Sequence, residues 1–222
     1  MADAIPSVLI NLTEIEWAPV MDGVKAKNIW SDSETKRRVA LTRFEPGATL
    51  PMHRHVGDEM LFVLEGAITD ESSTVVAGNM GFRPNGCVHS VSSKNGATVL
   101  ALITGGVEPA KAPGDAPRSQ LFVLSDLPWV DALPGVRQKR IWDDAQSGRH
   151  VALARFEPGA SLPKHRHAGD EILYMIEGSS ADEFAEVTAG MMSYRPNGCA
   201  HSVRSRNGGT VLAFVRGGVE KA

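Results

Sequence analysis

The sequence predicts an all-β protein made of two small barrel or jelly-roll domains in tandem. Short apolar stretches end at turn residues about every ten positions, and glycine (22) and proline (13) are frequent. No stretch shows a helical period over three turns. Residues 12–110 align with residues 124–222 without a gap, and 55 of the 99 aligned pairs are identical. A repeat this long in 222 residues indicates one duplicated domain rather than a solenoid.

The domain boundaries follow from the duplication. We expect an N-terminal domain over residues 1–110 and a C-terminal domain over residues 121–222. Between them, residues 109–120 read PAKAPGDAPRSQ. This segment cannot supply a hydrophobic core, and its three prolines favour a partly extended chain. We therefore predict that it is a linker.

Five strands are predicted in the first repeat, and the same five recur 112 residues later. They cover residues 39–44, 59–65, 80–83, 89–91 and 98–103. Glu45-Pro46-Gly47 ends the first, Gly66 the second, Pro84-Asn85-Gly86 the third and Gly105-Gly106 the last. The opening segment, residues 10–17, fits an edge strand or a short turn of helix equally well.

Composition narrows the functional classes. The formal net charge of −3 gives no reason to expect nucleic acid or an anionic membrane as a partner. No stretch approaches the ~20 apolar residues of a membrane helix. Residues 1–6 hold no basic region or long apolar run, so no signal peptide is expected. The two cysteines, Cys87 and Cys199, belong to different repeats and predict no disulfide framework. We expect a soluble cytoplasmic protein.

Metal-ligand residue types recur at fixed spacing. His53 and His55 are two apart, so in a strand both imidazoles point to one face. Glu59 follows after a turn, and His89 comes from a later strand. The second repeat places His165, His167, Glu171 and His201 at the same spacing. Six of the seven histidines of the chain fall in this pattern. The sequence therefore predicts two metal sites, one in each domain.

The ligand types indicate a divalent transition metal. Three imidazoles and a carboxylate would leave open positions on six-coordinate iron, manganese or nickel, whereas zinc would be nearly closed by all four. We expect zinc if the protein is regulatory, and iron, manganese or nickel if it is an enzyme.

These residues also match a known family. The spacing of Gly47, His53, His55, Glu59 and Gly66 fits the first cupin motif. The spacing of Gly78, Pro84, Gly86 and His89 fits the second, and the other repeat fits both. The chain therefore resembles a bicupin along nearly its whole length, which implies two jelly-roll β-barrels. It departs from the motif at Ser93 and Ser205, where an asparagine that is not a ligand often stands.

A narrower resemblance concerns residues 64–71, 77–78 and 83–89. They are similar to the cupin domain of ChrR-type anti-sigma factors, which implies a zinc-binding sensory module. In those factors a separate N-terminal zinc domain binds the sigma factor. The eleven residues before the first repeat contain no His or Cys, so we do not expect that domain here. Related cupins include iron dioxygenases that cleave small diketones or aromatic ketones.

Two further pairs of residues are candidates for the pocket lining. Cys87 and Cys199 each lie two residues before the last histidine of a site, where the thiol would share its face. We favour the alternative, a small buried apolar residue. Arg43 and Arg155 could bind a substrate carboxylate, or pair with a nearby acidic residue such as Glu45.

Three functions remain open at this point. The first is a sensory or regulatory module that binds zinc or a small ligand and acts on a protein partner. The second is a metal-dependent dioxygenase or related enzyme with a small-molecule substrate, in which Glu59 or Glu171 could act as a base. The third is a structural or storage cupin. A homodimer is plausible for barrels with exposed edge strands.

Overall fold

The computed structural model describes residues 5–222, and it confirms the all-β prediction of two tandem barrels. By internal contacts the chain divides into two units. The N-terminal unit is Ile15–Leu124, and the C-terminal unit is Ser125–Ala222 with the described residues up to Glu14. The signal-peptide expectation rests partly on residues 1–4, which lie outside the described residues. No helix in residues 5–222 is long and apolar enough to cross a membrane.

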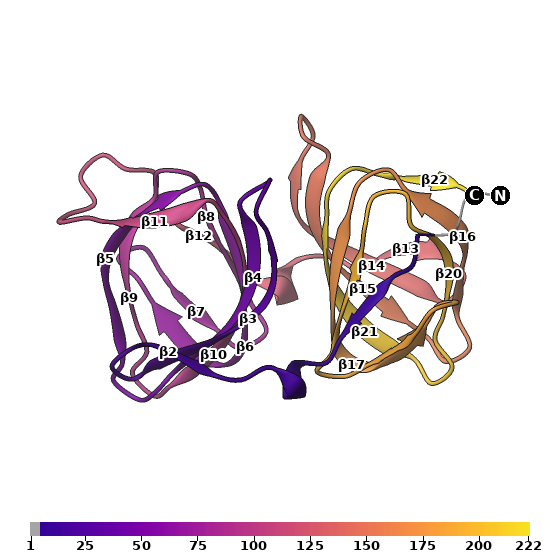
Figure 1. The fold of residues 1–222 in the computed structure, drawn as a ribbon, viewed down its shortest axis with the longest axis horizontal. Coiled ribbons are helices and arrows are strands. Elements are labelled where there is room, and N and C mark those ends of the chain that lie inside the picture. Colours follow the sequence, from indigo (N-terminus) through magenta and orange to yellow (C-terminus); the bar gives the residue numbers. More distant parts are fainter. Residues whose placement is uncertain (1–4) are drawn as a thin grey trace. The chain divides into compact units, whose positions relative to one another are not determined.

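The N-terminal unit is one curled sheet of eleven strands (Figure 1). Its strands are β2 (Ala18–Met21), β3 (Val24–Asp32), β4 (Arg37–Phe44), β5 (Thr49–Val56), β6 (Glu59–Thr69), β7 (Thr74–Val76), β8 (Met80–Arg83), β9 (Val88–Ser92), β10 (Ala97–Thr104), β11 (Gly106–Pro109) and β12 (Gln120–Phe122). The main path runs β11-β5-β9-β6-β10-β4-β3-β2, while β7 and β8 pair with β6, and β12 pairs with β8. All pairings are antiparallel, which suits a chain of short strands joined by tight turns.

The C-terminal unit repeats this topology. Its elements are β1 (Val8–Ile10), the 3₁₀ helix η1 (Leu12–Glu14), β13 (Val130–Leu133), β14 (Val136–Asp144), β15 (Arg149–Phe156), β16 (Ser161–His167), β17 (Glu171–Ala181), β18 (Glu186–Thr188), β19 (Met192–Arg195), β20 (Ala200–Arg204), β21 (Gly209–Val215) and β22 (Val219–Lys221). A second 3₁₀ helix, η2 (Leu124–Asp126), spans the boundary between the units. The opening segment thus contains the end of a strand at Ile10 and a helical turn at η1, so both alternatives for it are partly realised.

The predicted strand end at Gly66 is wrong. β6 continues through Gly66 to Thr69, and its register with β10 shifts between Thr98 and Val99. Gly66 has φ +70°, and a Cβ there would lie 2.0 Å from the carbonyl oxygen of Gly96. The residue that the register shift leaves without a partner is Leu64, two positions before Gly66, while Gly66 itself pairs with Ala97, so the strand continues through the glycine instead of ending.

The core of the N-terminal unit lies inside the curled sheet. The residues of this core cluster alternate along the strands, although β6 and β10 also carry buried residues on their other face. The cluster includes Phe44 on β4, Leu61 and Val63 on β6, and Val99 and Ala101 on β10. The equivalent cluster of the C-terminal unit includes Phe156, Leu173, Met175 and Val211.

The first strand of each repeat pairs in a way that the sequence did not predict. β12 follows the linker, yet it pairs with β8 of the N-terminal unit, with Gln120 opposite Phe82. β1, its counterpart 112 residues earlier, pairs with β19 of the C-terminal unit, with Val8 opposite Tyr194. Each unit is thus completed by a strand that the sequence repeat assigns to the other half of the chain.

Candidate metal centres

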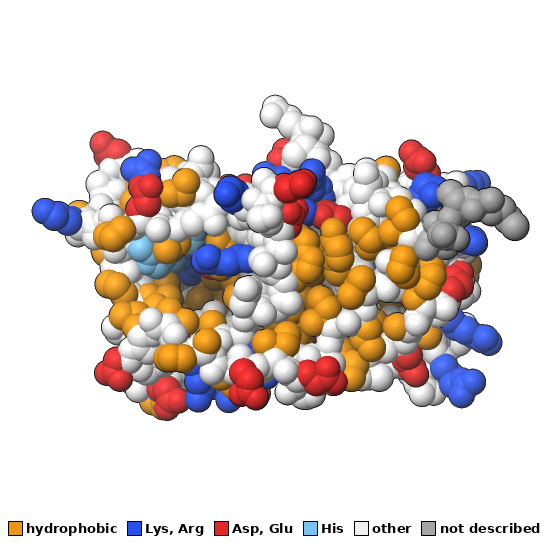
Figure 2. All heavy atoms as spheres, viewed as in Figure 1, with side chains coloured by type: hydrophobic (Ala, Val, Ile, Leu, Met, Phe, Trp, Pro, Cys, Tyr) orange, Lys and Arg blue, Asp and Glu red, His pale blue; other side chains and the backbone are white. Residues whose placement is uncertain are grey.

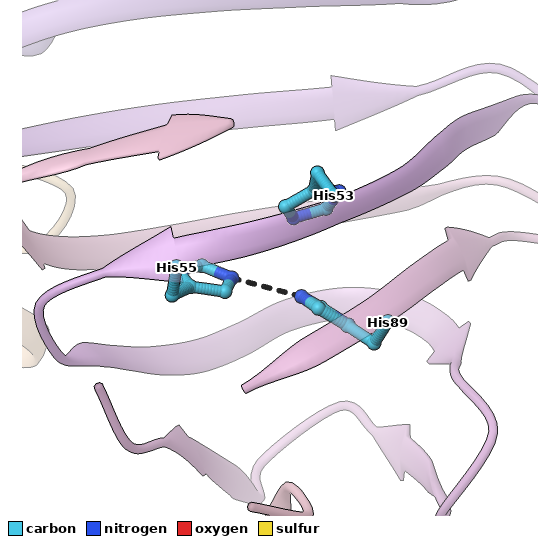
Figure 3. A group of neighbouring side chains, drawn as sticks. All are labelled: His53, His55 and His89. Carbon is cyan, nitrogen blue, oxygen red and sulfur yellow. Dashed lines mark hydrogen bonds between the residues drawn. The ribbon is translucent and has the colours of Figure 1, made fainter. Parts of the chain in front are cut away.

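Two neighbouring strands bring three histidines together in the N-terminal unit. His53 and His55 lie on β5 and point to the same side, and His89 lies on β9 directly opposite His53 (Figure 3). One candidate ligand atom from each of the three lies within 4.8 Å of the others. His165, His167 and His201 form the same cluster on β16 and β20. The structure thus brings all six histidines together as two sets of three.

The tightest contact in each cluster joins two ring nitrogens. Nε2 of His55 is 2.8 Å from Nε2 of His89, and the His167–His201 pair repeats this at 2.9 Å. The four side chains of these pairs are buried. Nε2 atoms that converge this closely offer their lone pairs to one small volume.

The protonation state of the rings suits a cation. Burial above all, with a smaller contribution from neighbouring His89 and against the opposing effect of Glu59, lowers the pKa of His55 to about 4. Burial also lowers the pKa of His53. At neutral pH these rings are therefore uncharged, which is the form that binds metal. Burial lowers the pKa of His167 to about 4 in the same way.

The backbone fixes the tautomer of the first histidine. Nδ1 of His53 lies 2.9 Å from the carbonyl oxygen of Pro51, to which it can only donate. His165 makes the same contact with Pro163 at 2.9 Å. The proton is therefore held on Nδ1 and Nε2 is left free, an arrangement that typically orients a metal-binding imidazole.

Glu59 and Glu171 lie beside the clusters but face a buried arginine. Oε2 of Glu59 is 3.8 Å from Nε2 of His55 and 3.5 Å from Nε of Arg83. Burial alone would raise the pKa of Glu59, but the Arg83 guanidinium and the histidines lower it overall. Glu171 contacts Nη1 of Arg195 at 2.5 Å. Both carboxylates are thus ionised and lie close enough to the histidines to contribute to metal binding. Their role as fourth ligands of the metal stays a prediction.

The sequence did not predict the buried arginine–aspartate pair that lies next to the histidines in each unit. Arg83 and Asp70 are 1% exposed and form an ion pair of 3.2 Å between Nη2 and Oδ2. Oδ2 of Asp70 also lies 3.6 Å from Nδ1 of His89. Arg195 and Asp182 occupy the same places in the C-terminal unit, with Oδ2 of Asp182 3.4 Å from Nδ1 of His201. One signal was available: both residues are identical in the two repeats although charged side chains are rarely buried.

The donor set fits a divalent transition-metal ion. Nδ1 of His89 has a carboxylate within reach, as metal-bound imidazoles usually do. Nε of Arg83 lies 3.3 Å from the same Nδ1, but it has Glu59 as an alternative acceptor. At His201 no arginine competes with the carboxylate for Nδ1, since this buried atom has no hydrogen bond among the described residues. The three Nε2 atoms would hold the ion in each unit.

The turn before Glu59 depends on a glycine. Gly57 has φ +124°, and its N–H donates to Oδ1 of Asn85 at 2.9 Å. A Cβ on Gly57 would lie 2.3 Å from the carbonyl oxygen of Thr104. The N–H of Asn85 in turn donates to Asp58 at 2.9 Å. These contacts tie the turn that carries Glu59 to the turn that precedes His89.

The cysteines and the arginines singled out from the sequence lie away from the histidine nitrogens. Cys87 is buried, and burial raises the pKa of its thiol to about 11. Its carbonyl oxygen accepts from the N–H of His55. Arg43 is exposed and lies over the ring of Trp17, at 4.6 Å. Cys199, whose thiol pKa is also raised by burial, and Arg155, over Trp129, repeat these placements.

A cavity of about 510 Å³ lies beside the histidines of the N-terminal unit. His53, His55 and Glu59 form part of its wall, Arg38 and Asn28 add polar groups, and most of the remaining lining is aliphatic. Figure 2 shows histidine side chains (pale blue) at a hollow, with hydrophobic side chains (orange) around it and a basic one (blue) beside it. The volume and the mostly apolar wall are typical of a small-molecule site.

Solved structures show the same fold. A putative dioxygenase from Nostoc punctiforme matches with a TM-score of 0.77 at 17% identity, covering 97% of this chain and 82% of that one. A tryptophan variant of the oxalate decarboxylase of Bacillus subtilis matches with a TM-score of 0.75 at 16% identity, covering 100% and 80%. At this identity the likeness concerns the fold alone. No curated protein matches the chain.

The sequence itself matches a family model described as the ChrR Cupin-like domain. The model matches twice, over residues 6–107 and 118–220, and so covers nearly the whole chain. Each match contains one three-histidine cluster. The chain therefore belongs to the ChrR cupin-like family, as a bicupin with two three-histidine sites of metal-binding type.

Proposed function

We propose that the chain is a metal-dependent enzyme that acts on a small, enolisable carbonyl compound in the N-terminal unit. The observation that carries this proposal is the cavity of about 510 Å³ that has His53, His55 and Glu59 in its wall. A buried structural metal would need no such space beside it. The cavity gives a substrate direct access to the ligand atoms.

The wall residues divide into binding and proton-transfer roles. Arg38 is partly buried, and its guanidinium makes no hydrogen bond or ion pair within residues 5–222, so it is available to an anionic or carbonyl oxygen. Glu59 is the carboxylate in the wall, and it is ionised at neutral pH. It would accept the proton that leaves the carbon next to the carbonyl. The aliphatic wall would hold the apolar part of the substrate and exclude water.

The proposed reaction is the oxidative cleavage of a small diketone or aromatic ketone. Dioxygen is the co-substrate: one carbon–carbon bond breaks, and both oxygen atoms enter the products. A divalent ion bound by the three histidines would supply Lewis-acid activation of the substrate oxygens. Iron is the metal that we propose for this chemistry.

The two units differ at the cavity wall. The C-terminal unit has Gln138 where Ala26 stands, Arg140 where Asn28 stands and His150 where Arg38 stands. The larger side chains Gln138 and Arg140 would narrow the equivalent space. We therefore propose that turnover takes place in the N-terminal unit, and that the C-terminal centre has a different or purely structural use.

Oxygen uptake by the iron-loaded chain with a panel of diketones and aryl ketones tests this proposal. We expect turnover that is abolished by His53→Ala with His55→Ala, and retained by the matched His165→Ala with His167→Ala. Ala26→Gln with Asn28→Arg should raise the KM without loss of bound iron. No turnover by a chain that holds iron and binds the ligands would refute the enzymatic proposal.

A second function is favoured by the family match itself. The ChrR Cupin-like model matches both repeats, so a sensory module that binds zinc or a small ligand and signals to a protein partner is the alternative proposal. It is distinguished by the metal of the purified protein and by turnover. Stoichiometric zinc, with ligand binding and no consumption of oxygen, would favour the sensor.

A further inference from the structure

In each unit a serine hydroxyl bonds the buried aspartate that lies next to the last histidine of the cluster. Oγ of Ser119 donates to Oδ2 of Asp70 at 2.7 Å. The same carboxylate oxygen accepts from Arg83 at 3.2 Å and lies 3.6 Å from Nδ1 of His89. Backbone N–H groups of Ser72 and Ser73 hold the other oxygen, Oδ1, at 2.8 and 2.9 Å. The orientation of the carboxylate toward His89 is thus set by donors on both of its oxygens.

The C-terminal unit contains the same arrangement. Oγ of Ser7 donates to Oδ2 of Asp182 at 2.7 Å, and this oxygen lies 3.4 Å from Nδ1 of His201. Backbone N–H groups of Phe184 and Ala185 donate to Oδ1 at 2.9 Å. Here the arginine is more distant, at 3.9 Å between its Nε and Oδ2. Ser7 is therefore the close side-chain donor that aligns this oxygen with the histidine.

Both serines lie next to β1 or β12, the strands that pair outside their own repeat. Ser119 directly precedes β12, which pairs with β8 of the N-terminal unit. Ser7 directly precedes β1, which pairs with β19 of the C-terminal unit. The two serines are 112 residues apart and so occupy the same place in the repeat. Each strand pairing delivers one hydroxyl to the carboxylate behind one cluster.

We propose that Ser119 and Ser7 are positioning residues for the two metal centres, acting through Asp70 and Asp182. The serine hydroxyl holds Oδ2 where it can accept the Nδ1 proton of the last histidine. At His201, whose Nδ1 has no other hydrogen bond among the described residues, that contact would keep the lone pair on Nε2, which faces the other histidines. At His89 it would do so in place of the 3.3 Å contact in which Nε of Arg83 donates to Nδ1. Each centre therefore depends on a residue from the repeat to which it does not belong in sequence. The proposal rests on metal binding by the histidines and not on the enzymatic activity.

The affinity of one centre at a time for Co²⁺ tests the proposal in the full chain. With the C-terminal centre disabled by His165→Ala and His167→Ala, Ser119→Ala should weaken binding about five- to tenfold, the range expected for one lost hydrogen bond. It should also shift the visible Co²⁺ bands. Ser119→Thr, which keeps the hydroxyl, should restore both. Ser7→Ala is the matched control and should change neither.

The reciprocal background exchanges these roles. With His53→Ala and His55→Ala, Ser7→Ala should weaken Co²⁺ binding and Ser119→Ala should not. An unchanged affinity in the matching variant, a loss that threonine does not restore, or an equal effect of both serines on one centre would overturn the proposal. Failure of the unchanged chain to bind two ions would instead refute metal binding itself.

A second measurement avoids the histidine variants, should they fail to fold. In the otherwise unchanged chain, native mass spectrometry counts bound Co²⁺ at a free concentration that just fills both centres. Ser119→Ala and Ser7→Ala should each lower the count from two towards one, and the double variant should lower it further. Full occupancy in both single variants would overturn the proposal.

Discussion

Nε2 of His55 and Nε2 of His89 face each other at 2.8 Å inside the N-terminal barrel, with both rings buried. Without a cation, this contact requires one ring to donate to the other, and burial lowers the pKa of His55 so that its ring is uncharged at neutral pH. The same relationship between His167 and His201 shows that it belongs to the repeated architecture and not to one barrel. The first consequence of this contact concerns how the stability of the protein depends on pH.

The metal-free protein should lose stability as the pH falls below about 6.5. Burial lowers the pKa of His55 and His167 to about 4, against 6.5 in an unfolded chain. Between these values the unfolded chain binds more protons, so the free energy of unfolding decreases with decreasing pH. Asp70 and Asp182, whose pKa values are also lowered, extend the loss below pH 3.8.

Urea unfolding of the metal-free chain at pH 7.5, 6 and 5 measures this effect. His55→Gln with His167→Gln removes two of the titrating groups and should reduce the dependence between pH 6.5 and 4. A free energy of unfolding that stays constant over this range in the unchanged chain would contradict the prediction.

Replacement of Arg83 should strongly destabilise the N-terminal unit. Arg83→Met removes the cation that lies between Asp70 and Glu59, and leaves Asp70 buried without a counter-charge. Breaking a buried ion pair on one side typically costs about 3–5 kcal/mol. Denaturant unfolding should show such a loss, whereas Arg54→Met, on the exposed side of β5, should change stability by less than about 0.5 kcal/mol.

The double variant Arg83→Met with Asp70→Leu separates charge from packing. If the uncompensated carboxylate causes the loss, removing it should recover part of the stability. A double variant that is no more stable than Arg83→Met would assign the cost to packing alone.

A methyl group at Gly57 should disturb the turn that carries Glu59. Both Gly57→Ala and Gly47→Ala place alanine at positive φ, a strain of roughly 1–2 kcal/mol. Only at Gly57 would the new Cβ also overlap a backbone oxygen, since nothing lies within 4 Å of a Cβ on Gly47. Thermal unfolding should therefore show a larger loss for Gly57→Ala, and equal losses would be inconsistent with the overlap.

The cysteine thiols should be unreactive in the folded protein. Burial raises the pKa of Cys87 to about 11 and also raises that of Cys199, so little thiolate is present at pH 8. Alkylation by iodoacetamide followed by mass spectrometry should show two modifications in urea and almost none without it. Rapid native alkylation of either thiol would reveal an accessible thiolate instead.

The first two histidines of each cluster were predictable because their geometry is local, whereas His89 was predicted from the repeat and the cupin spacing. A spacing of two residues on a strand places His53 and His55 on one face whatever the rest of the fold does. The repeat, by itself, also predicted two similar β domains. The continuation of β6 through Gly66 was not predictable, because a glycine that ends a strand and one that lies within a strand look alike in sequence.

The buried polar residues next to the histidines could not be predicted from local sequence patterns, for a different reason. Arg83, Asp70 and Ser119 lie far apart in the chain, and they meet only through the pairing of β8 with β6 and with β12. Since Ser7 and Ser119 are equivalent in the two repeats, no local pattern says which carboxylate each one meets. That choice is made by the pairing of β1 and β12.

The pairing of β1 with β19 also sets an order of events during synthesis. Ser7 and Asp182 are 175 residues apart, so β1 leaves the ribosome long before the strand with which it pairs. The N-terminal unit has all its strands once Leu124 has emerged. Until β19 follows, β1 is an unpaired edge that a chaperone or a neighbouring nascent chain can bind. Translation through β19 is therefore the step at which β1 either pairs within its own chain or is exchanged with another copy.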